Sequence, residues 1–497
     1  MTNSPTPRSA ADNIANLKGR PQTIPALQEW TTATGTYTFS EHARIVLNET
    51  YATQLKEIGD VFAADLKQLT GFSIPVVSES SARDGDIWLS LSQDTALGHE
   101  GYVLEVAASL HILAPEDHGI FYGTRTVLQL LRQSYSLPAG TARDWPEYPE
   151  RSLMVDVGRK YFSLHWLESY IRDLAYLKFN YFHLHLSDNY GFRLESERHP
   201  EVMSPQHYTR AEIQQLLELA RRYHVTIVPE IDMPGHMDTI LAHHPELQLV
   251  DVTGKRKPGD IDLGNEQAYS LIKDLLDEFI PLFPGPYWHI GADEYLMHED
   301  YSNYPQLLEY ARTHYGPAAT ERDTYLGFVN WANDIIKSHG KVTRVWNDGL
   351  YGGTAITIAK DMVYEHWLNA GLSPQELIEQ QIPIMNCNAD LLYYVLGPHF
   401  PTGPDQVYEQ FEQRVFQGHI RVEPSHLKKI GAKLHVWCDH PEEQTENQVA
   451  AGIGAILRSL SQANWGSPKL VASYSQYQPL VTQLGYAPGY NIPVDIL

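Results

Sequence analysis

The stretch YWHIGADE, residues 287–294, decides the fold class, because an apolar run of strand length ends there in two adjacent carboxylates. Similar runs recur along the chain and give eight predicted strands: Leu153–Arg159, Asn180–Asp188, Val225–Asp232, Tyr287–Glu294, Val342–Asp348, Met362–Trp367, Ile382–Asn388 and Ala432–Asp439. Helical patterns separate several of them, over Leu164–Lys178, Arg210–Tyr223, Tyr269–Phe283 and Leu326–His339. This alternation is typical of parallel βα units and predicts a (β/α)8 barrel.

Polar and aromatic residues gather at the carboxyl ends of these predicted strands. In chain order they are Arg159, Asp188, Asp232 with His236, Asp293 with Glu294, Trp346 with Asp348, Trp367, Tyr393, and Trp437 with Asp439. In a barrel all these strand ends surround one cavity, where such enzymes hold their catalytic groups. Charged residues that merely mark where strands reach the surface would explain one or two of these positions, but not the whole set with its tryptophans.

The segment before the barrel is expected to form a small α/β domain, since 497 residues exceed what one hydrophobic core usually supports. Its strand and helix patterns fall at Ala43–Leu47, Tyr51–Leu69, Asp86–Ser92, Tyr102–Val106 and Gly119–Arg132. A stretch rich in Pro, Glu and Tyr around Trp145–Glu150 is interpreted as the linker. We therefore expect an irregular arm over residues 1–25, the small domain over 26–148 and the barrel over 149–497.

Composition narrows the range of partners. A net charge of −24 repels phosphate backbones and anionic lipid surfaces, so neither nucleic acid nor membrane is expected as a partner. Cys387 and Cys438 are the only cysteines, which excludes a disulfide framework. Because the first twenty residues contain no apolar run of signal-peptide length, we expect either an intracellular protein or one whose leader has been removed. Nothing indicates the oligomeric state.

The predicted pocket suits neutral polar rings. It combines carboxylates, one arginine and several tryptophans, with no Gly-rich phosphate loop or Cys/His metal cage, so we expect an oligosaccharide or glycoconjugate substrate, glycoside cleavage, no cofactor and no metal. Tryptophan can stack on sugar rings, although the same rings also fill protein cores. Adjacent strand residues point to opposite faces, so only a bend would bring both Asp293 and Glu294 into the cavity, side by side. That arrangement favours one acid and one helper.

Four motifs in this order resemble glycoside hydrolase family 20, the β-N-acetylhexosaminidases. They are DVGR at 156–159, HLHLSD at 183–188, PEIDMPGH at 229–236 and HIGADE at 289–294. The run from GIFYG at 119–123 to QLL at 129–131 is similar to the family's segment preceding the barrel. The resemblance thus covers most of the chain.

The resemblance implies a retaining, exo-acting hydrolase of terminal β-linked GlcNAc or GalNAc, in which the sugar's acetamido oxygen attacks C1 to form an oxazolinium ion. Glu294 would protonate the leaving oxygen and later deprotonate water, which calls for a raised pKa. Asp293 would hold the acetamido N–H. Arg159 would bind the outer hydroxyls, and Asp188 with His236 would tune Glu294.

The remaining site residues implied by the resemblance surround the sugar. Trp346, Trp367 and Trp437 would wall the acetamido pocket and the ring face, and Tyr393 would bond the acetamido oxygen. Asp439 would bind outer hydroxyls, but the family commonly has Glu at this position.

Other departures from the family pattern are Ala292 in place of Gly, Phe192 in place of Trp, and the absence of an Asp after Tyr393. They are similar to branches that include biofilm-glucosamine hydrolases and lacto-N-biosidases. The alternative activity is therefore release of Gal-β1,3-GlcNAc by the same mechanism, which needs a roomier pocket.

Two other classes of protein remain as alternatives. His183 and His185 share one strand face, so one alternative is a metal-dependent amidohydrolase with His236 and Asp293 as further ligands; their other interpretation is a hydrogen-bonded support below the site. A noncatalytic carbohydrate-binding protein on the same fold is disfavoured by retention of the Asp-Glu pair. Arg159 could also be a structural ion-pair partner, and His236 a turn residue bonded to backbone.

Overall fold

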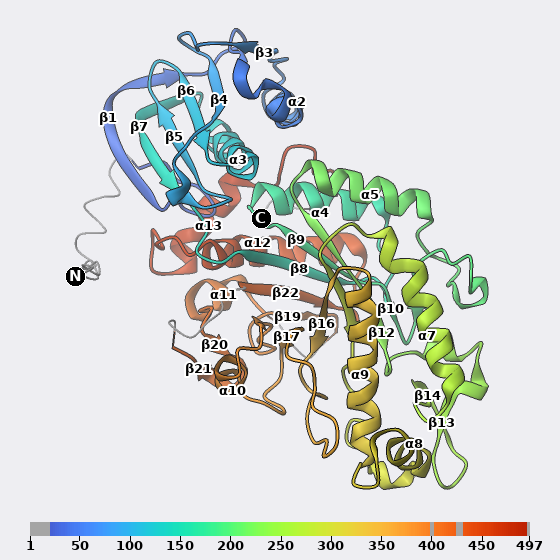
Figure 1. The fold of residues 1–497 in the computed structure, drawn as a ribbon. Helices are drawn as coiled ribbons and strands as arrows, with labels where there is room; N and C mark the ends of the chain where they lie inside the picture. The colour runs from blue at the N-terminus through green and yellow to red at the C-terminus, as the bar shows by residue number, and fades with distance from the viewer. Residues whose placement is uncertain (1–19, 398–401, 424–430, 495–497) are drawn as a thin grey trace.

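The computed structural model describes residues 20–397, 402–423 and 431–494, and it consists of a small sheet domain packed against a barrel (Figure 1). The irregular arm expected over residues 1–25 lies outside the described residues as far as residue 19. Cys387 and Cys438 are both buried and not bridged. Among the described residues, no helix is long and apolar enough to cross a membrane.

The small domain is a seven-stranded mixed sheet. Its strands, in the order in which they lie side by side, are β1 (Glu29–Thr38), β7 (Ser136–Asp144), β5 (Tyr102–Val106), β6 (Leu110–Ala114), β4 (Ile87–Leu91), β2 (Ile45–Asn48) and β3 (Val76–Glu79). Its two long helices are α2 (Ala52–Thr70) and α3 (Asp117–Gln133). Helix α2 ends at Thr70, one residue beyond the predicted range, and the next residue, Gly71, adopts φ 79° and donates its N–H to the carbonyl of Lys67 at 2.9 Å.

Eight parallel strands close into the predicted barrel. In chain order they are β8 (Glu150–Asp156), β9 (Tyr181–His185), β12 (Thr226–Met233), β15 (Tyr287–Gly291), β16 (Val342–Trp346), β17 (Val363–His366), β18 (Ile384–Asn386) and β22 (Gly431–Trp437). Every residue of β8 and β22 is buried, which is typical of parallel strands covered on both faces. The barrel prediction is therefore confirmed. Strand β8 begins at Glu150, the last residue of the stretch interpreted as the linker.

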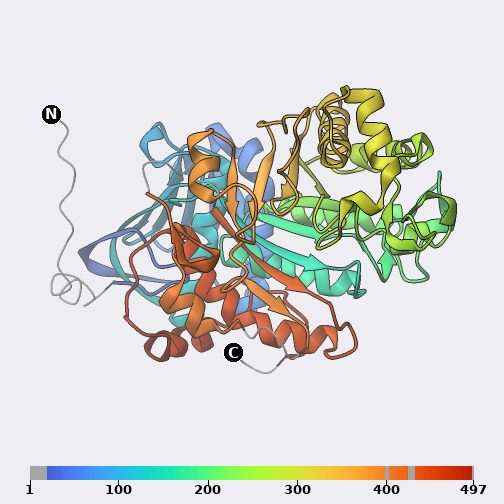
Figure 2. The same ribbon diagram turned by 90° about the horizontal axis from the view of Figure 1, so that it is seen from below.

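Helices surround the barrel (Figures 1 and 2). The four predicted ones are α4 (Leu164–Tyr176), α5 (Arg210–Arg222), α7 (Glu266–Phe279) and α9 (Glu321–Ser338). Helices without a sequence prediction are α6 (Asp238–Leu241), α8 (Pro305–Tyr315), α10 (Pro374–Glu379), α11 (Pro404–Gln410), α12 (Glu446–Trp465) and α13 (Tyr474–Leu484). Helix α3 packs against both α4 and the small sheet, which joins the two parts.

Barrel closure is uneven between β18 and β22. They pair through one residue pair, Asn386 with Ala432. Beyond that point a short strand without a sequence prediction, β19 (Tyr393–Val395), runs parallel to β22, with Tyr393 opposite His435 and Val395 opposite Trp437. The remaining strands are short pairs outside the barrel: β10 (Ser187–Asp188) with β11 (Gly191–Phe192), β13 (Gln248–Val250) with β14 (Arg256–Ile261), and β20 (Val415–Phe416) with β21 (Ile420–Arg421).

Candidate active site

A tight bend after β15 places the two neighbouring carboxylates. The strand ends at Gly291, three residues earlier than predicted, because Gly291, Ala292 and Glu294 adopt φ of 71°, 69° and 54°. A Cβ at Gly291 would lie 1.6 Å from Oδ1 of Asp232, so only glycine fits there. Asp293 and Glu294 then both face His236, whose Nε2 lies 3.8 Å from Oδ2 of Asp293 and 3.2 Å from Oε2 of Glu294.

The bend opens onto a cavity of about 290 Å³ at the carboxyl ends of the barrel strands. Its lining comprises Arg159, His236, Asp293, Glu294, Trp346, Trp367, Ala389, Tyr393, Val395, Trp437 and Asp439. Asp188 does not line the cavity but lies behind it, 2.8 Å from Arg159 and 3.3 Å from His236, which do line it. The structure thus brings the predicted site residues together in one place, and their individual roles stay predictions.

Arg159 is both a cavity residue and an ion-pair partner. Its guanidinium lies 2.8 Å from Oδ2 of Asp188 and 3.1 Å from Oδ2 of Asp156. The same group lies 5.3 Å from the ring centre of Trp437, within the range of a cation–π contact. Asp439 is exposed, on the same side of the cavity as Arg159.

A chain of polar contacts runs from Glu294 into the barrel. His236 lies 3.2 Å from Glu294 and, through Nδ1, 3.3 Å from Oδ1 of Asp188. Oδ2 of Asp188 lies 2.9 Å from Nε2 of His185, whose Nδ1 is 2.6 Å from Glu230. Burial opposes protonation of His236, but the carboxylates of Asp188 and Asp293 raise its pKa well above the usual value.

The pKa values of Asp293 and Glu294 are shifted in opposite directions. The imidazole of His236, 3.2 Å from its carboxylate, lowers the pKa of Glu294, against the raised pKa expected from its role. Burial raises the pKa of Asp293 to about 7, and the carboxylates of Asp348 and Glu294 add to the effect. Asp293 is only 8% exposed, and its Oδ1 has no hydrogen-bond partner among the described residues. The cavity therefore contains a buried acceptor that a ligand N–H can satisfy.

Aromatic rings form the other walls. Trp367 and Tyr393 stack with ring centres 5.9 Å apart and planes inclined by 11°. Nε1 of Trp367 donates to Oδ1 of Asp348 at 3.1 Å, which fixes that indole. Trp346 and Trp437 pack 5.7 Å apart in a small apolar cluster distinct from the main core. Flat walls of this kind suit the C–H faces of a pyranose ring.

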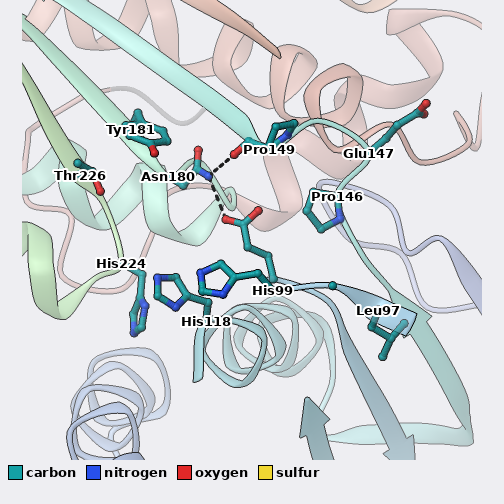
Figure 3. Close-up of a pocket in the computed structure, with 12 residues that line it drawn as sticks. Leu97, His99, His118, Pro146, Glu147, Pro149, Asn180, Tyr181, His224 and Thr226 are labelled. Atoms are coloured by element: carbon teal, nitrogen blue, oxygen red, sulfur yellow. Dashed lines mark hydrogen bonds between the residues drawn. The ribbon is translucent and has the colours of Figure 1, made fainter. Parts of the chain in front are cut away.

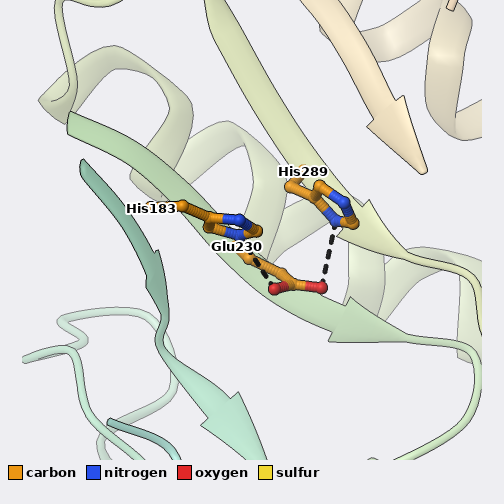
Figure 4. A group of neighbouring side chains, drawn as sticks. All are labelled: His183, Glu230 and His289. Atoms are coloured by element: carbon orange, nitrogen blue, oxygen red, sulfur yellow. Dashed lines mark ion pairs between the residues drawn. The ribbon is translucent and has the colours of Figure 1, made fainter. Parts of the chain in front are cut away.

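Histidines beneath the cavity converge on one glutamate (Figure 4). Glu230 lies between His183, 2.9 Å away, and His289, 3.0 Å away. The ammonium of Lys433 lies 2.7 Å from Nδ1 of His183, where a positive charge opposes a cation. The ligand set of the amidohydrolase alternative is not assembled, because His183 contacts Glu230 and Lys433 while His236 contacts Asp188 and Glu294. A support role for these histidines fits the contacts better.

Sequence reasoning assigned no role to two further carboxylates. Oε1 of Glu230 accepts from Nε1 of Trp346 at 2.9 Å, and Oδ2 of Asp348 accepts the backbone N–H of Glu294 at 2.9 Å. Both lie in predicted strands, and the period of two in a strand places Glu230 on the same face as Asp232. Val395 carried no signal, because β19 was not predicted.

The chain matches two family models over nearly its whole length. Residues 148–457 match the catalytic domain of glycosyl hydrolase family 20, and residues 20–145 match domain 2 of that family. The lacto-N-biosidase of Bifidobacterium bifidum is 32% identical over 100% of this chain, and the beta-hexosaminidase of Porphyromonas gingivalis is 29% identical over 61% of it. The chain spans less than half the length of these relatives, 44% and 43% respectively.

Solved structures agree on the fold. A mutant beta-hexosaminidase of Streptomyces plicatus, in complex with its product GlcNAc, superposes with a TM-score of 0.75 at 23% identity, covering 96% of this chain and 97% of that one. An exo beta-N-acetylglucosaminidase of Vibrio harveyi gives 0.77 at 21% identity, covering 97% and 79%. The family models, the relatives and the barrel with its preceding domain lead to one conclusion: the chain belongs to glycosyl hydrolase family 20.

Proposed function

We propose that this chain hydrolyses β-linked N-acetylhexosaminides from the non-reducing end with retention, using the substrate's own acetamido group as the nucleophile. The observation that carries the proposal is the unpartnered Oδ1 of Asp293, buried beside Glu294 in an aromatic-walled cavity. An acetamido N–H supplies the missing donor, and Trp346, Trp367 and Trp437 then surround the methyl group and the ring.

The pKa directions suggest how the proton reaches Glu294. In the free enzyme Asp293, with a pKa of about 7, holds the proton more readily than Glu294 does. An acetamido N–H bonded to Asp293 favours its carboxylate form, and the new negative charge raises the proton affinity of Glu294. Substrate binding thereby transfers the acid proton to the residue beside the leaving group.

Bond cleavage follows from that placement. The acetamido oxygen attacks C1, the bond from C1 to the leaving oxygen breaks, and Glu294 gives its proton to that oxygen. Ionised Asp293 holds the N–H of the oxazolinium ion and stabilises its positive charge. Water then attacks C1, the bond from C1 to the acetamido oxygen breaks, and the water gives a proton to Glu294, which restores the enzyme and the β configuration. The side chain of Glu294 is 39% exposed, so water can reach it.

The released unit is proposed to be the disaccharide Gal-β1,3-GlcNAc rather than a single sugar. The relative named lacto-N-biosidase aligns over 100% of the chain, whereas relatives named beta-hexosaminidase align over 61%, 70% and 53%. Asp439 is exposed and lines the cavity together with Arg159, and it is one methylene shorter than the family's usual Glu, which favours a larger ligand at this wall. Release of terminal GlcNAc or GalNAc remains the second candidate.

Two chromogenic substrates test both levels of the proposal. We expect the purified chain to release p-nitrophenol from the β-lacto-N-bioside faster than from β-N-acetylglucosaminide, with retained configuration by NMR. A thiazoline mimic of the cyclised intermediate should inhibit at concentrations far below KM. Faster release from the monosaccharide would leave the mechanism standing and reverse the disaccharide assignment, while indifference to the thiazoline would remove the acetamido route.

A further inference from the structure

Two copies of the tripeptide His-Pro-Glu meet in the fold, at residues 199–201 and 244–246. The first lies in the connection from β9 to α5 and the second in the connection from β12 to α7. In each, the histidine precedes a short 3-10 helix, η3 (Pro200–Val202) or η4 (Pro245–Leu247), with φ and ψ of −130° and 65° or −127° and 58°. The backbone conformations of His199 and His244 are therefore nearly identical.

One carboxylate oxygen lies against both imidazoles. Oε1 of Glu201 is 3.0 Å from Nδ1 of His199 and 3.0 Å from Nε2 of His244. Ligand atoms from the three residues all fall within 4.8 Å of one another. In the part of the chain that the structure describes, Glu201 pairs with these imidazoles and with no lysine or arginine.

The opposite nitrogen of each ring also faces a carboxylate. Nε2 of His199 lies 3.6 Å from Oδ2 of Asp274 in α7, and Nδ1 of His244 lies 3.7 Å from Oε1 of Glu246. The other oxygen of Asp274 pairs with Arg198 at 3.3 Å, so that guanidinium lies on the outer side of the group. Metal-bound histidines almost always have such a carboxylate or carbonyl beyond the second nitrogen.

Proton counting favours a cation over a purely hydrogen-bonded cluster. A neutral imidazole has one N–H, so it can donate to Glu201 or to its outer carboxylate but not to both. If both rings donate to Glu201, their outer nitrogens present lone pairs to Asp274 and Glu246, which is repulsive. A metal ion bound to the inner nitrogens lets each N–H point outward, and every group is then satisfied without an extra proton.

We propose that His199, Glu201 and His244 form a zinc site, completed by water. Two imidazole nitrogens and one carboxylate oxygen are ligands that zinc prefers in a four-coordinate site. The ion would tie together the two connections that also carry Asp188 and His236, and so hold the backbone on one side of the cavity. The inference rests on these contacts alone and does not depend on the proposed activity.

Zinc titration of the untagged full chain, stripped with EDTA and exchanged into metal-free buffer, tests the site. We expect one equivalent to bind with micromolar or tighter affinity and to raise the melting temperature. Glu201→Gln and the double variant His199→Ala/His244→Ala should each weaken binding at least tenfold. Asp274→Asn, which removes an outer carboxylate, should weaken it by about tenfold.

His339→Ala is the matched control, because His339 also lies on the surface beside a carboxylate, Asp277 at 3.3 Å, but pairs with no carboxylate shared by another histidine of the described residues. It should bind zinc as the unmodified chain does. Variants are compared only if their melting temperature in EDTA equals that of the unmodified chain. If the double variant does not meet this criterion, the test uses Glu201→Gln, which keeps the shape of the side chain. Absence of stoichiometric binding, or equal affinity in Glu201→Gln, would overturn the proposal.

Discussion

The barrel has a cavity at each end. The two cavities differ in volume and in the kinds of side chain that line them. The cavity at the amino ends of β9 and β12 measures about 410 Å³, against about 290 Å³ for the one at the carboxyl ends. A row of histidines lines the larger one (Figure 3), with ring centres 4.1 Å apart for His99 and His118 and 4.5 Å apart for His118 and His224.

The buried carboxylate of the larger cavity, Glu100, already has partners. Both oxygens of Glu100 accept from Arg151 at 2.8 Å, and one also accepts from Asn180 at 2.9 Å. In the smaller cavity Asp293 keeps an oxygen without a partner among the described residues, and tryptophans form much of the wall, with His236 as the one histidine of the lining. Volume alone would choose the amino end, whereas the site proposed at the carboxyl end combines an unsatisfied buried acceptor with flat apolar walls, as ligand pockets do.

Removing the acid at the carboxyl end should have the largest effect. Glu294→Gln keeps the shape but cannot exchange the proton, so we expect kcat to fall by about 10³-fold or more. Steady-state assays on the better chromogenic substrate measure this, with circular dichroism as the folding control. A variant that retained more than a tenth of the activity would remove Glu294 from its assigned role.

Breaking the ion pair between Arg151 and Glu100 at the amino end of the barrel should instead lower the free energy of unfolding. Arg151→Met leaves Glu100 buried without its cation, so the free energy of unfolding should fall by about 3–5 kcal/mol. Activity per folded molecule should not change. Urea denaturation measures the loss, and Arg143→Met is the control, because Arg143 pairs with Asp94 at an exposed site where the expected loss is below about 1 kcal/mol. Equal losses in the two variants would contradict the assignment.

The free energy of unfolding should depend on pH because the pKa of Asp293, at the carboxyl end of the barrel, is raised in the native state. With a pKa of about 7 in the native state against 3.8 in the unfolded chain, the native state binds this proton more tightly. The stability that the proton provides is complete below about pH 4 and is lost as the pH rises through 7.

The Asp293→Asn variant should not lose stability in this way as the pH rises, because asparagine does not ionise. Although its kcat should fall, it should be more stable than the unmodified chain by about 2 kcal/mol at pH 8, with the difference vanishing near pH 4. Urea denaturation across this pH range measures the difference. A constant difference at every pH would show that Asp293 does not titrate as inferred.

The smallest effect is expected from the histidine row. His118→Gln should change kcat and KM by less than about twofold, because the row contacts no residue of the carboxyl-end cavity and a surface polar substitution changes stability little. The same assay as for Glu294→Gln measures it. A large fall in kcat with unchanged melting temperature would give the larger cavity a catalytic role and so break the comparison.

The sequence predicted the barrel because its strands are buried on both faces and therefore appear as continuous apolar runs. The cavity residues could be found for a related reason, since a carboxylate or tryptophan at the end of such a run stands out. The strand β1 could not be found in this way. Its residues are mostly exposed, and its pairing with β7 joins Glu29 to Arg143 across the whole domain.

Local sequence also could not give the pKa of Glu294. Burial alone would raise it, and the direction changes because the bend at 291–294 turns the carboxylate toward His236, from a different strand connection, with a smaller effect from Arg159. Helix α12 was missed although Thr445 and Gln448 form a capping box at its start. That signal was present in the sequence and could have been used.

The short strand β19 shapes a wall of the cavity without taking part in the closure of the barrel. Tyr393 and Val395 reach the cavity from a segment that pairs with β22 but is not one of the eight closing strands. Substitution or lengthening of this segment can therefore reshape the proposed sugar pocket while the closed ring of strands, and the position of Glu294, stay intact. Descendants of this chain could acquire a new glycan preference through changes in that wall alone.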